Sequence, residues 1–188
     1  MTYCFVAAGR HYDGFYLTFS LFLSRVDPNG KPCFDVLFGP AYKGISLGAV
    51  VSSSLYHMFG VDVGFGYNRK EAKSHGEGGT LVGASLNGKR VLIVDDVITA
   101  GTAIRESHTM LLEAGAKPVG VVIALDRAEK RSLDDPVSAV QAVARDLGLP
   151  VISIVSLPQL QTFLEKDIAT YGAETLENVK KYRAEYGV

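Results

Sequence analysis

The sequence predicts an α/β fold, with a mostly parallel central sheet that is flanked by helices. Short apolar segments rich in β-branched residues recur along the chain, at 34–38, 61–67, 91–94, 119–125 and 151–155. Segments with helical apolar spacing lie between most of them, and this alternation favours parallel pairing because a crossover helix returns the chain to the same end of the sheet. No repeat, low-complexity tract or linker interrupts the pattern, so we expect a single domain, 1–188.

Glycine, proline and asparagine mark where the elements of the first half begin and end. Gly39-Pro40 would end the first strand, and Gly60 would stop the first helix. Asn87-Gly88 is typical of a hairpin turn. The expected elements are a strand at 34–38, a mostly buried helix at 45–58, a strand at 61–67, a polar surface loop at 69–79 and a hairpin arm at 80–85.

In the second half, the strand at 91–94 leads through a short loop into a helix that would close at Gly115. One side of this helix is formed by Ile104, His108, Leu111 and Leu112. Asp135-Pro136 resembles a helix start, with a capping residue followed by proline, and Gly148 would end that helix. The remaining expected elements are strands at 119–125 and 151–155 and helices at 159–165 and 174–185.

Composition excludes several classes of protein. The 188 residues include 47% apolar and 21% charged side chains, as in an ordinary soluble globular protein. The net charge of −1 gives no general attraction to nucleic acid or anionic membrane, and no apolar run reaches the roughly 18 residues of a spanning helix. The N-terminus lacks the features of a secretory signal, and Cys4 and Cys33 lack metal or redox spacing. We therefore expect a cytoplasmic protein whose cysteines remain thiols.

The most informative segment joins the strand at 91–94 to the helix that follows it. Asp95 and Asp96 end the apolar run. Bare carboxylates cannot be buried unpaired, so they should stand at the carboxyl end of the strand, where α/β sheets bind ligands. Thr99-Ala-Gly-Thr102 then offers backbone N–H groups and hydroxyls at a helix start, which suits an anion. Carboxylates that can hold a diol, beside a phosphate cradle, indicate a site for a phosphorylated ribose.

Two other segments carry charge that suits phosphate groups. Residues 38–44, Phe-Gly-Pro-Ala-Tyr-Lys-Gly, form a turn at the same sheet edge, where Lys43 could meet a pyrophosphate or be a solvated lysine. Residues 68–79, Asn-Arg-Lys-Glu-Ala-Lys-Ser-His-Gly-Glu-Gly-Gly, hold several cations and nothing that can build a core. They could close as a cationic lid over a departing pyrophosphate. They could also be a solvated loop or a small nucleic-acid patch, although Glu71 and Glu77 weaken the nucleic-acid interpretation.

Together these segments resemble a known family. Val-Asp-Asp-Val-Ile-Thr-Ala-Gly-Thr-Ala-Ile at 94–104 is similar to the phosphoribosyl pyrophosphate (PRPP) signature of the type I phosphoribosyltransferases. The turn at 38–44, the loop at 68–79, Ala124-Leu-Asp-Arg127 and the closing Tyr182-Arg-Ala-Glu-Tyr-Gly-Val188 resemble the orotate phosphoribosyltransferases within that superfamily. The match runs from about Phe34 to the C-terminus. It implies the type I phosphoribosyltransferase fold, here with a small or incomplete N-terminal hood.

The resemblance implies a role for each matching position. The two aspartates would hold the ribose hydroxyls, the loop after them would hold the 5′-phosphate, and Tyr42 and Lys43 would lie along the pyrophosphate. Residues implied to bind PRPP are Tyr42, Lys43, Arg69, Lys70, Lys73, His75, Asp95, Asp96, Val97, Ile98, Thr99, Ala100, Gly101, Thr102 and Ala103. Those implied to be catalytic are Lys73, Arg69, His75 and Asp96, with Lys73 the most important for the chemical step.

Thr99 and Arg127 are implied to contact orotate, Arg127 through a bidentate pair with its carboxylate. Taken alone, Arg127 would be interpreted as a surface arginine at a strand end. The implied reaction is magnesium-dependent transfer of phosphoribose from PRPP to N1 of orotate, which gives orotidine 5′-phosphate and pyrophosphate in pyrimidine (UMP) biosynthesis. PRPP would hold most of the magnesium coordination, with no direct protein ligand.

The expected partners are the small molecules PRPP and orotate and a second copy of the chain. In that homodimer, lid residues 69–79 and Lys70 would complete the neighbouring site. No nucleic acid or membrane partner is expected.

The start of the chain departs from the family pattern. Thr2-Tyr-Cys-Phe-Val6 is a degraded match to a segment with paired aromatics, and the substrate-side lysine before it is absent. Either the chain is truncated or its base site is built differently; the aromatic segment 12–23 would be a helix packed on the sheet. Two alternatives stay open: a purine or uracil phosphoribosyltransferase, and a non-catalytic or weakly active PRPP-binding regulator.

Overall fold

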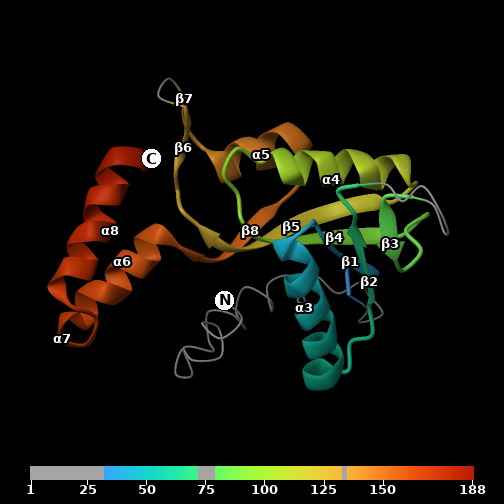
Figure 1. The fold of residues 1–188 in the computed structure, drawn as a ribbon, viewed down its shortest axis with the longest axis horizontal. Helices are drawn as coiled ribbons and strands as arrows, with labels where there is room; N and C mark the ends of the chain where they lie inside the picture. Colours follow the sequence, from blue (N-terminus) through green and yellow to red (C-terminus); the bar gives the residue numbers. More distant parts are fainter. Residues whose placement is uncertain (1–31, 72–78, 133–134) are drawn as a thin grey trace.

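The computed structural model describes residues 32–71, 79–132 and 135–188, and it confirms the α/β architecture (Figure 1). Within these ranges, the central sheet has six strands in the order β3-β2-β1-β4-β5-β8. Neighbouring strands are parallel except β2 and β3, which are antiparallel. The strands are β1 (Val36–Gly39), β2 (Gly64–Asn68), β3 (Leu81–Gly83), β4 (Arg90–Val97), β5 (Lys117–Asp126) and β8 (Val151–Ser156).

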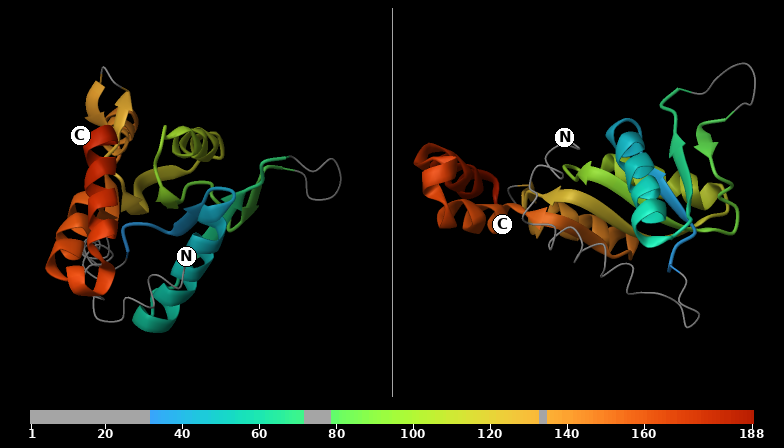
Figure 2. Two further views of the ribbon diagram at one scale, coloured as in Figure 1. Left: turned by 60° about the vertical axis from the view of Figure 1, so that its left-hand side comes forward. Right: turned by 90° about the horizontal axis from the view of Figure 1, so that it is seen from below.

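Helices cover both faces of the sheet (Figures 1 and 2). Helix α3 (Lys43–Phe59) lies on one face, and α4 (Thr102–Glu113) and α5 (Ala139–Leu147) lie on the other. A hydrophobic core lies on each face of the sheet. Strand β4 contributes side chains to both, because successive side chains of a strand point to opposite faces. Val91 and Ile93 pack in the cluster that contains α4 and α5, while Leu92 and Val94 pack in the cluster that contains α3.

The C-terminal helices α6 (Leu157–Lys166), α7 (Ile168–Tyr171) and α8 (Ala173–Tyr186) stand to one side of the sheet, after β8 (Figures 1 and 2). The end of the chain then returns to the segment that follows β5. Val188 N–H donates to the Ala128 carbonyl at 2.9 Å, and Glu129 and Gly187 form an antiparallel bridge. The C-terminus therefore lies beside the carboxyl end of β5.

The expected helix start at Asp135-Pro136 is wrong. This dipeptide begins strand β7 (Asp135–Ser138), which pairs with β6 (Lys130–Ser132) in a hairpin that the sequence did not predict. Helix α5 begins three residues later, because Ser138 accepts the Gln141 N–H and the Gln141 side chain accepts the Ser138 N–H. That reciprocal capping box satisfies more backbone groups than an Asp-Pro start would.

Three smaller expectations also need correction. The arm at 80–85 pairs with β2 across the loop that precedes it, whereas Asn87-Gly88 connects β3 to β4 at a distant position in the sheet. Helix α3 is only half buried: Tyr56 and Met58 are more than half exposed. On α4, Ser107 replaces Leu112 on the buried side, since Leu112 is 53% exposed.

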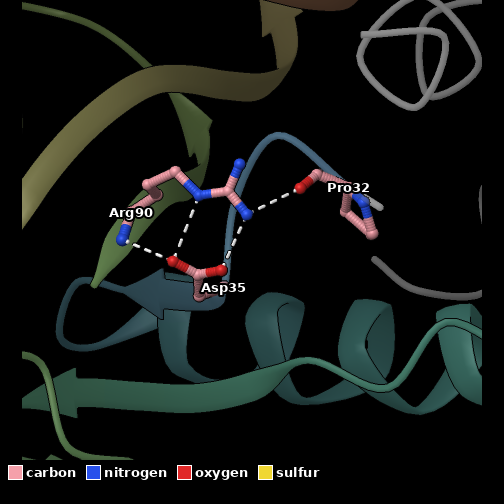
Figure 3. A network of polar contacts seen from close by, with 3 residues as sticks. All are labelled: Pro32, Asp35 and Arg90. Carbon is pink, nitrogen blue, oxygen red and sulfur yellow. Dashed lines mark hydrogen bonds and ion pairs between the residues drawn. The ribbon is translucent and has the colours of Figure 1, made fainter. Parts of the chain in front are cut away.

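An ion-pair network joins the amino ends of β1 and β4, at the edge of the sheet opposite the aspartates (Figure 3). The Arg90 guanidinium donates to both carboxylate oxygens of Asp35, and it also donates to the Pro32 carbonyl at 2.9 Å. The Arg90 backbone N–H adds a further bond to Asp35 at 2.8 Å. These bonds hold the pKa of Asp35 below its usual value, so this carboxylate stays charged at neutral pH.

The expected N-terminal hood, the helix at 12–23 and Cys4 lie outside the described residues. In the part of the chain that the structure describes, no helix is both long and apolar enough to cross a membrane.

Candidate active site

Two adjacent carboxylates stand at the carboxyl end of β4, the edge where the sequence predicted them. Asp95 lies deeper than expected, because β4 continues to Val97 and Asp95 pairs in register with Ile123 of β5. Asp95 is 9% exposed and accepts the Asp96 N–H at 2.9 Å. Burial raises the pKa of the Asp95 carboxyl to about 6, although that hydrogen bond acts in the opposite direction.

A lysine at the start of α3, after the turn that follows the neighbouring strand β1, neutralises the second carboxylate. Lys43 Nζ lies 2.6 Å from Asp96 Oδ2, in a pair whose aspartate is mostly covered and whose lysine is exposed. The hydrogen bond to Asp96 and the charge of that carboxylate raise the pKa of Lys43, while the charge of Arg127 acts in the opposite direction. The two aspartates, Lys43 and Arg127 therefore share one charged region.

The turn before Lys43 depends on a close approach of Gly39 to Gly44, and a hydrogen bond to β2 holds it in place. A Cβ at Gly39 would lie 2.0 Å from the Gly44 carbonyl oxygen, so no larger residue fits this close return of the backbone. The Ala41 N–H donates to the Asn68 side-chain oxygen at 2.9 Å, which ties the turn to the base of the 69–79 loop. The Ala41–Tyr42 peptide bond is cis, and Tyr42 is 70% exposed at the tip of the turn.

The loop between β4 and α4 presents backbone N–H groups that have no hydrogen-bond acceptor among the described residues. Ile98 is buried and anchors it, whereas Thr99 and Thr102 are exposed. Gly101 precedes the helix with φ of 77°, a conformation that favours glycine. Among the described residues, no acceptor meets the backbone N–H groups of 99–103. Free N–H groups at the positive end of a helix dipole form an anion site.

The base of the expected lid stands beside the Lys43 turn. Lys70 Nζ lies over the Tyr42 ring of the same chain, 5.2 Å from its centroid, and Arg69 Nη1 donates to the Gly79 carbonyl at 3.5 Å. A cavity of about 390 Å³ opens here, lined by Tyr42, Ile45, Tyr67, Asn68, Arg69, Lys70 and Glu71. Lys73 and His75, expected as catalytic residues, lie outside the described residues.

On the other side of the aspartates, Arg127 directly follows β5 and is held by the C-terminal part of the chain. Its Nη2 lies 3.1 Å from Glu129 Oε2, and its Nη1 donates to the Tyr182 hydroxyl at 3.4 Å. The Tyr182 hydroxyl in turn donates to Glu129, which closes the network between β5 and α8. Arg127 Nε is buried and has no hydrogen-bond partner within the described part of the chain.

The described residues that were expected to bind PRPP lie at or just after the ends of strands β1, β2 and β4, and the structure brings them to one edge of the sheet. Arg127 and Thr99 follow the neighbouring strands β5 and β4, so they share this edge as expected. Three residues that hold the site in place by hydrogen bonds or ion pairs were not predicted from the sequence, and only one of them has a neighbour in the sequence that could have indicated its role. Asn68 and Tyr182 lie inside motifs without a distinguishing feature, whereas Glu129 follows Arg127 by two residues and has the opposite charge.

A parallel sheet with paired acids at one strand end, a glycine-capped anion loop after them and a cationic turn beside them defines a phosphoribosyltransferase. In agreement, a family model described as a phosphoribosyl transferase domain matches residues 23–146. That segment spans β1 to α5 and contains every described PRPP position predicted from the sequence.

Comparisons with known proteins narrow the class. The chain is 56% identical over 161 residues to an orotate phosphoribosyltransferase of Bordetella bronchiseptica, covering 82% of this chain and 70% of that protein. It is 51% identical over 185 residues to the Chromobacterium violaceum orotate phosphoribosyltransferase, covering 98% of this chain and 84% of that protein.

A solved orotate phosphoribosyltransferase of Francisella tularensis is 34% identical, with a TM-score of 0.72, over 93% of this chain and 78% of the other. The chain belongs to the orotate phosphoribosyltransferase family.

Proposed function

We propose that the chain transfers phosphoribose from PRPP to N1 of orotate, with orotidine 5′-phosphate and pyrophosphate as products. The observation that carries this is the row of backbone N–H groups at 99–103, which have no acceptor among the described residues and lie shortly after the buried Asp95. Phosphate binds to the N–H groups, and the carboxylates accept hydrogen bonds from a ribose diol. The two ends of a phosphorylated ribose are thereby fixed without any further group.

The remaining described residues fit the other two parts of the reaction. Lys43 places positive charge where the pyrophosphate would leave, and Tyr42 lies beside it in the same turn. Arg127 would pair with the orotate carboxylate at the same edge, since a guanidinium and a carboxylate match in two parallel hydrogen bonds. The C1–O bond breaks with oxocarbenium character, so the protein acts by orientation and by stabilising charge.

The acidic residues fit a magnesium ion that arrives with PRPP. Among the described residues, no group of three or more His, Cys, Asp or Glu side chains could enclose a metal, and Asp96 is already paired with Lys43. Bound magnesium would neutralise part of the pyrophosphate charge, and it prefers oxygen ligands supplied largely by substrate phosphates and water. Asp95 and Asp96 would contact it only through the ribose hydroxyls or water. We also propose the reducing cytoplasm as the compartment, on the spacing of the two cysteines.

The direct test is pyrophosphate release from PRPP and magnesium with orotate, uracil, hypoxanthine or adenine as the acceptor. We expect release with orotate alone. Release with a purine or uracil would move the chain to another branch of the superfamily. PRPP binding by calorimetry without release for any base would leave a PRPP-binding protein without transferase activity.

Lys73 is the residue that we expect to matter most for the chemical step, on its position in the lid motif. Lys73→Ala should keep PRPP binding within about threefold and lower kcat about 100-fold or more, as when one charge-stabilising group is removed. Unchanged kcat in single-turnover measurements would remove Lys73 from the mechanism.

We further propose a homodimer in which residues 69–79 of one subunit complete the site of the other. Lys73→Ala and Asp95→Ala damage different parts of the site, so mixed dimers would contain one intact site. Mixing the two inactive variants after unfolding and refolding should restore up to about one quarter of the activity, the statistical share of intact sites in random dimers. No recovery, with mixed dimers shown by native mass spectrometry, would contradict shared sites.

A further inference from the structure

Arg105 occupies a position in which a cation is electrostatically unfavourable. It lies in the first turn of α4, at the positive end of the helix dipole and beside the anion loop. Its charge is compensated from a different helix, since Nη2 lies 2.7 Å from Asp146 Oδ2 of α5. That hydrogen bond is the largest of the effects that hold the pKa of Asp146 below its usual value. A charge-neutralised pair in this position indicates a geometric role for the guanidinium.

The second nitrogen of the guanidinium contacts the loop itself. Arg105 Nη1 donates to the Ala100 carbonyl oxygen at 2.7 Å. The Ala100–Gly101 peptide is trans, and in a planar trans peptide the C=O and the following N–H point in opposite directions. A carbonyl held on the Arg105 side therefore turns the Gly101 N–H to the opposite side of the loop.

The packing around Gly101 leaves this peptide little freedom on the Arg105 side. A Cβ at Gly101 would lie 2.6 Å from Arg105 Nη1 and 2.4 Å from Val143 Cγ2 of α5. The guanidinium and α5 thus form a wall directly behind the loop. The Gly101 N–H, which has no acceptor among the described residues, faces away from this wall.

We propose that Arg105 is a positioning residue for the 5′-phosphate: through the Ala100 carbonyl it orients the Gly101 N–H toward the phosphate, while Asp146 holds its guanidinium in place. This inference rests on the proposed function, because it takes the 99–103 loop as the phosphate site. Arg105 itself would not touch the substrate. Its loss should weaken binding of the phosphate end without altering the pyrophosphate end.

The experiment compares Arg105→Met with Arg145→Met in the full chain. Arg145 is the matched control, because its Nε lies 3.4 Å from the same Asp146 carboxylate and, among the described residues, it forms no hydrogen bond or ion pair with the loop. The readouts are KM for PRPP and the inhibition constants of ribose 5-phosphate and pyrophosphate against PRPP. For Arg105→Met we expect the first two to rise about tenfold, equivalent to about 1.4 kcal/mol. The pyrophosphate constant should change less than twofold, and Arg145→Met should resemble the parent in all three.

Each other result has a defined meaning. Equal weakening of ribose 5-phosphate and pyrophosphate would indicate general damage and overturn the positioning role, as would parental values in Arg105→Met. Arg105→Lys guards against a folding defect, because lysine keeps the positive charge beside Asp146. Lysine has one nitrogen and cannot bond the Ala100 carbonyl and Asp146 with two separate ones, so we expect KM for PRPP and the ribose 5-phosphate constant to rise about threefold. Parental values would overturn the inference. If the parent itself neither turns over PRPP nor binds ribose 5-phosphate, the proposed phosphate site fails first, and that result is distinct from a failure of Arg105 alone.

Discussion

The proposed phosphate side and the proposed acceptor side of the candidate site are built in different ways. The proposed phosphate side consists of consecutive residues, 95–103, and the groups proposed to bind phosphate are mainly backbone N–H donors after one strand. The acceptor side depends on one guanidinium, Arg127, whose neighbours Glu129 and Tyr182 come from segments 53 residues apart. A backbone site is therefore encoded locally, whereas a side-chain site depends on how distant segments pack.

The largest expected difference between the two sides comes from Arg127→Met. Removing the proposed partner of the orotate carboxylate should lower kcat/KM for orotate about 150-fold, because losing one member of a desolvated charge pair costs on the order of 3 kcal/mol. KM for PRPP should stay within about threefold. Steady-state kinetics with each substrate varied in turn measures both, and Lys130→Met, an exposed cation nearby, serves as the control. A matching rise in KM for PRPP would contradict the separation of the two sides.

The locally encoded part of the site is also the part that can be predicted from the sequence. Asp95, Asp96 and the loop to Ala103 were predicted in place because one strand-loop-helix segment holds them all. The hairpin of β6 and β7 was missed because Asp135-Pro136 has the composition of a helix start, and only the Ser138 capping box decides against it. The bracing by Tyr182 could not be predicted, since it depends on where α8 returns the chain, whereas Glu129 carried a local signal two residues after Arg127.

Asp95→Asn tests whether the buried charge of Asp95, on the proposed phosphate side, lowers the free energy of unfolding. The folded-state pKa of Asp95 is about 6, above the ordinary aspartate value of 3.8, so keeping this carboxylate charged opposes folding. The cost grows as pH rises from about 4 to about 6 and is then constant, at up to about 3 kcal/mol. Asp95→Asn should therefore stabilise the free protein at pH 7.5 by about 2 kcal/mol, with little difference near pH 4.

Urea unfolding at the two pH values measures this, and PRPP affinity is measured in parallel. We expect the variant to bind PRPP at least tenfold more weakly, because an amide cannot replace a carboxylate toward a ribose diol. A variant that is less stable than the parent at pH 7.5 would show that the folded protein does not carry this cost. Such a trade of stability for binding is common where a site must hold a buried charge.

Tyr182→Phe asks how far the acceptor side depends on α8. The substitution removes the hydroxyl that accepts from Arg127 and donates to Glu129 but keeps the ring. We expect KM for orotate to rise about fivefold, near the value of one hydrogen bond to a charged group at a partly exposed site. Tyr186→Phe is the control, since the Tyr186 ring lies tilted against Tyr182 with centroids 5.0 Å apart and, among the described residues, its hydroxyl forms no hydrogen bond with Arg127. Equal effects of the two variants would mean that the helix contributes packing alone.

Asp35→Asn should affect neither side, because Asp35 lies at the opposite edge of the sheet in the network with Arg90 (Figure 3). Arg90 lowers the pKa of Asp35, so the stability that this carboxylate contributes is present above its ordinary pKa and is lost as pH falls through the lowered one. Both side chains are about one-third exposed, and solvent screening limits the expected loss to about 1 kcal/mol at pH 7. Urea unfolding should show this loss relative to Asp62→Asn, an exposed aspartate, while KM for both substrates stays at the parental value. A change in either KM would mean that the network at the amino ends of β1 and β4 transmits strain along these strands to the site at their carboxyl ends.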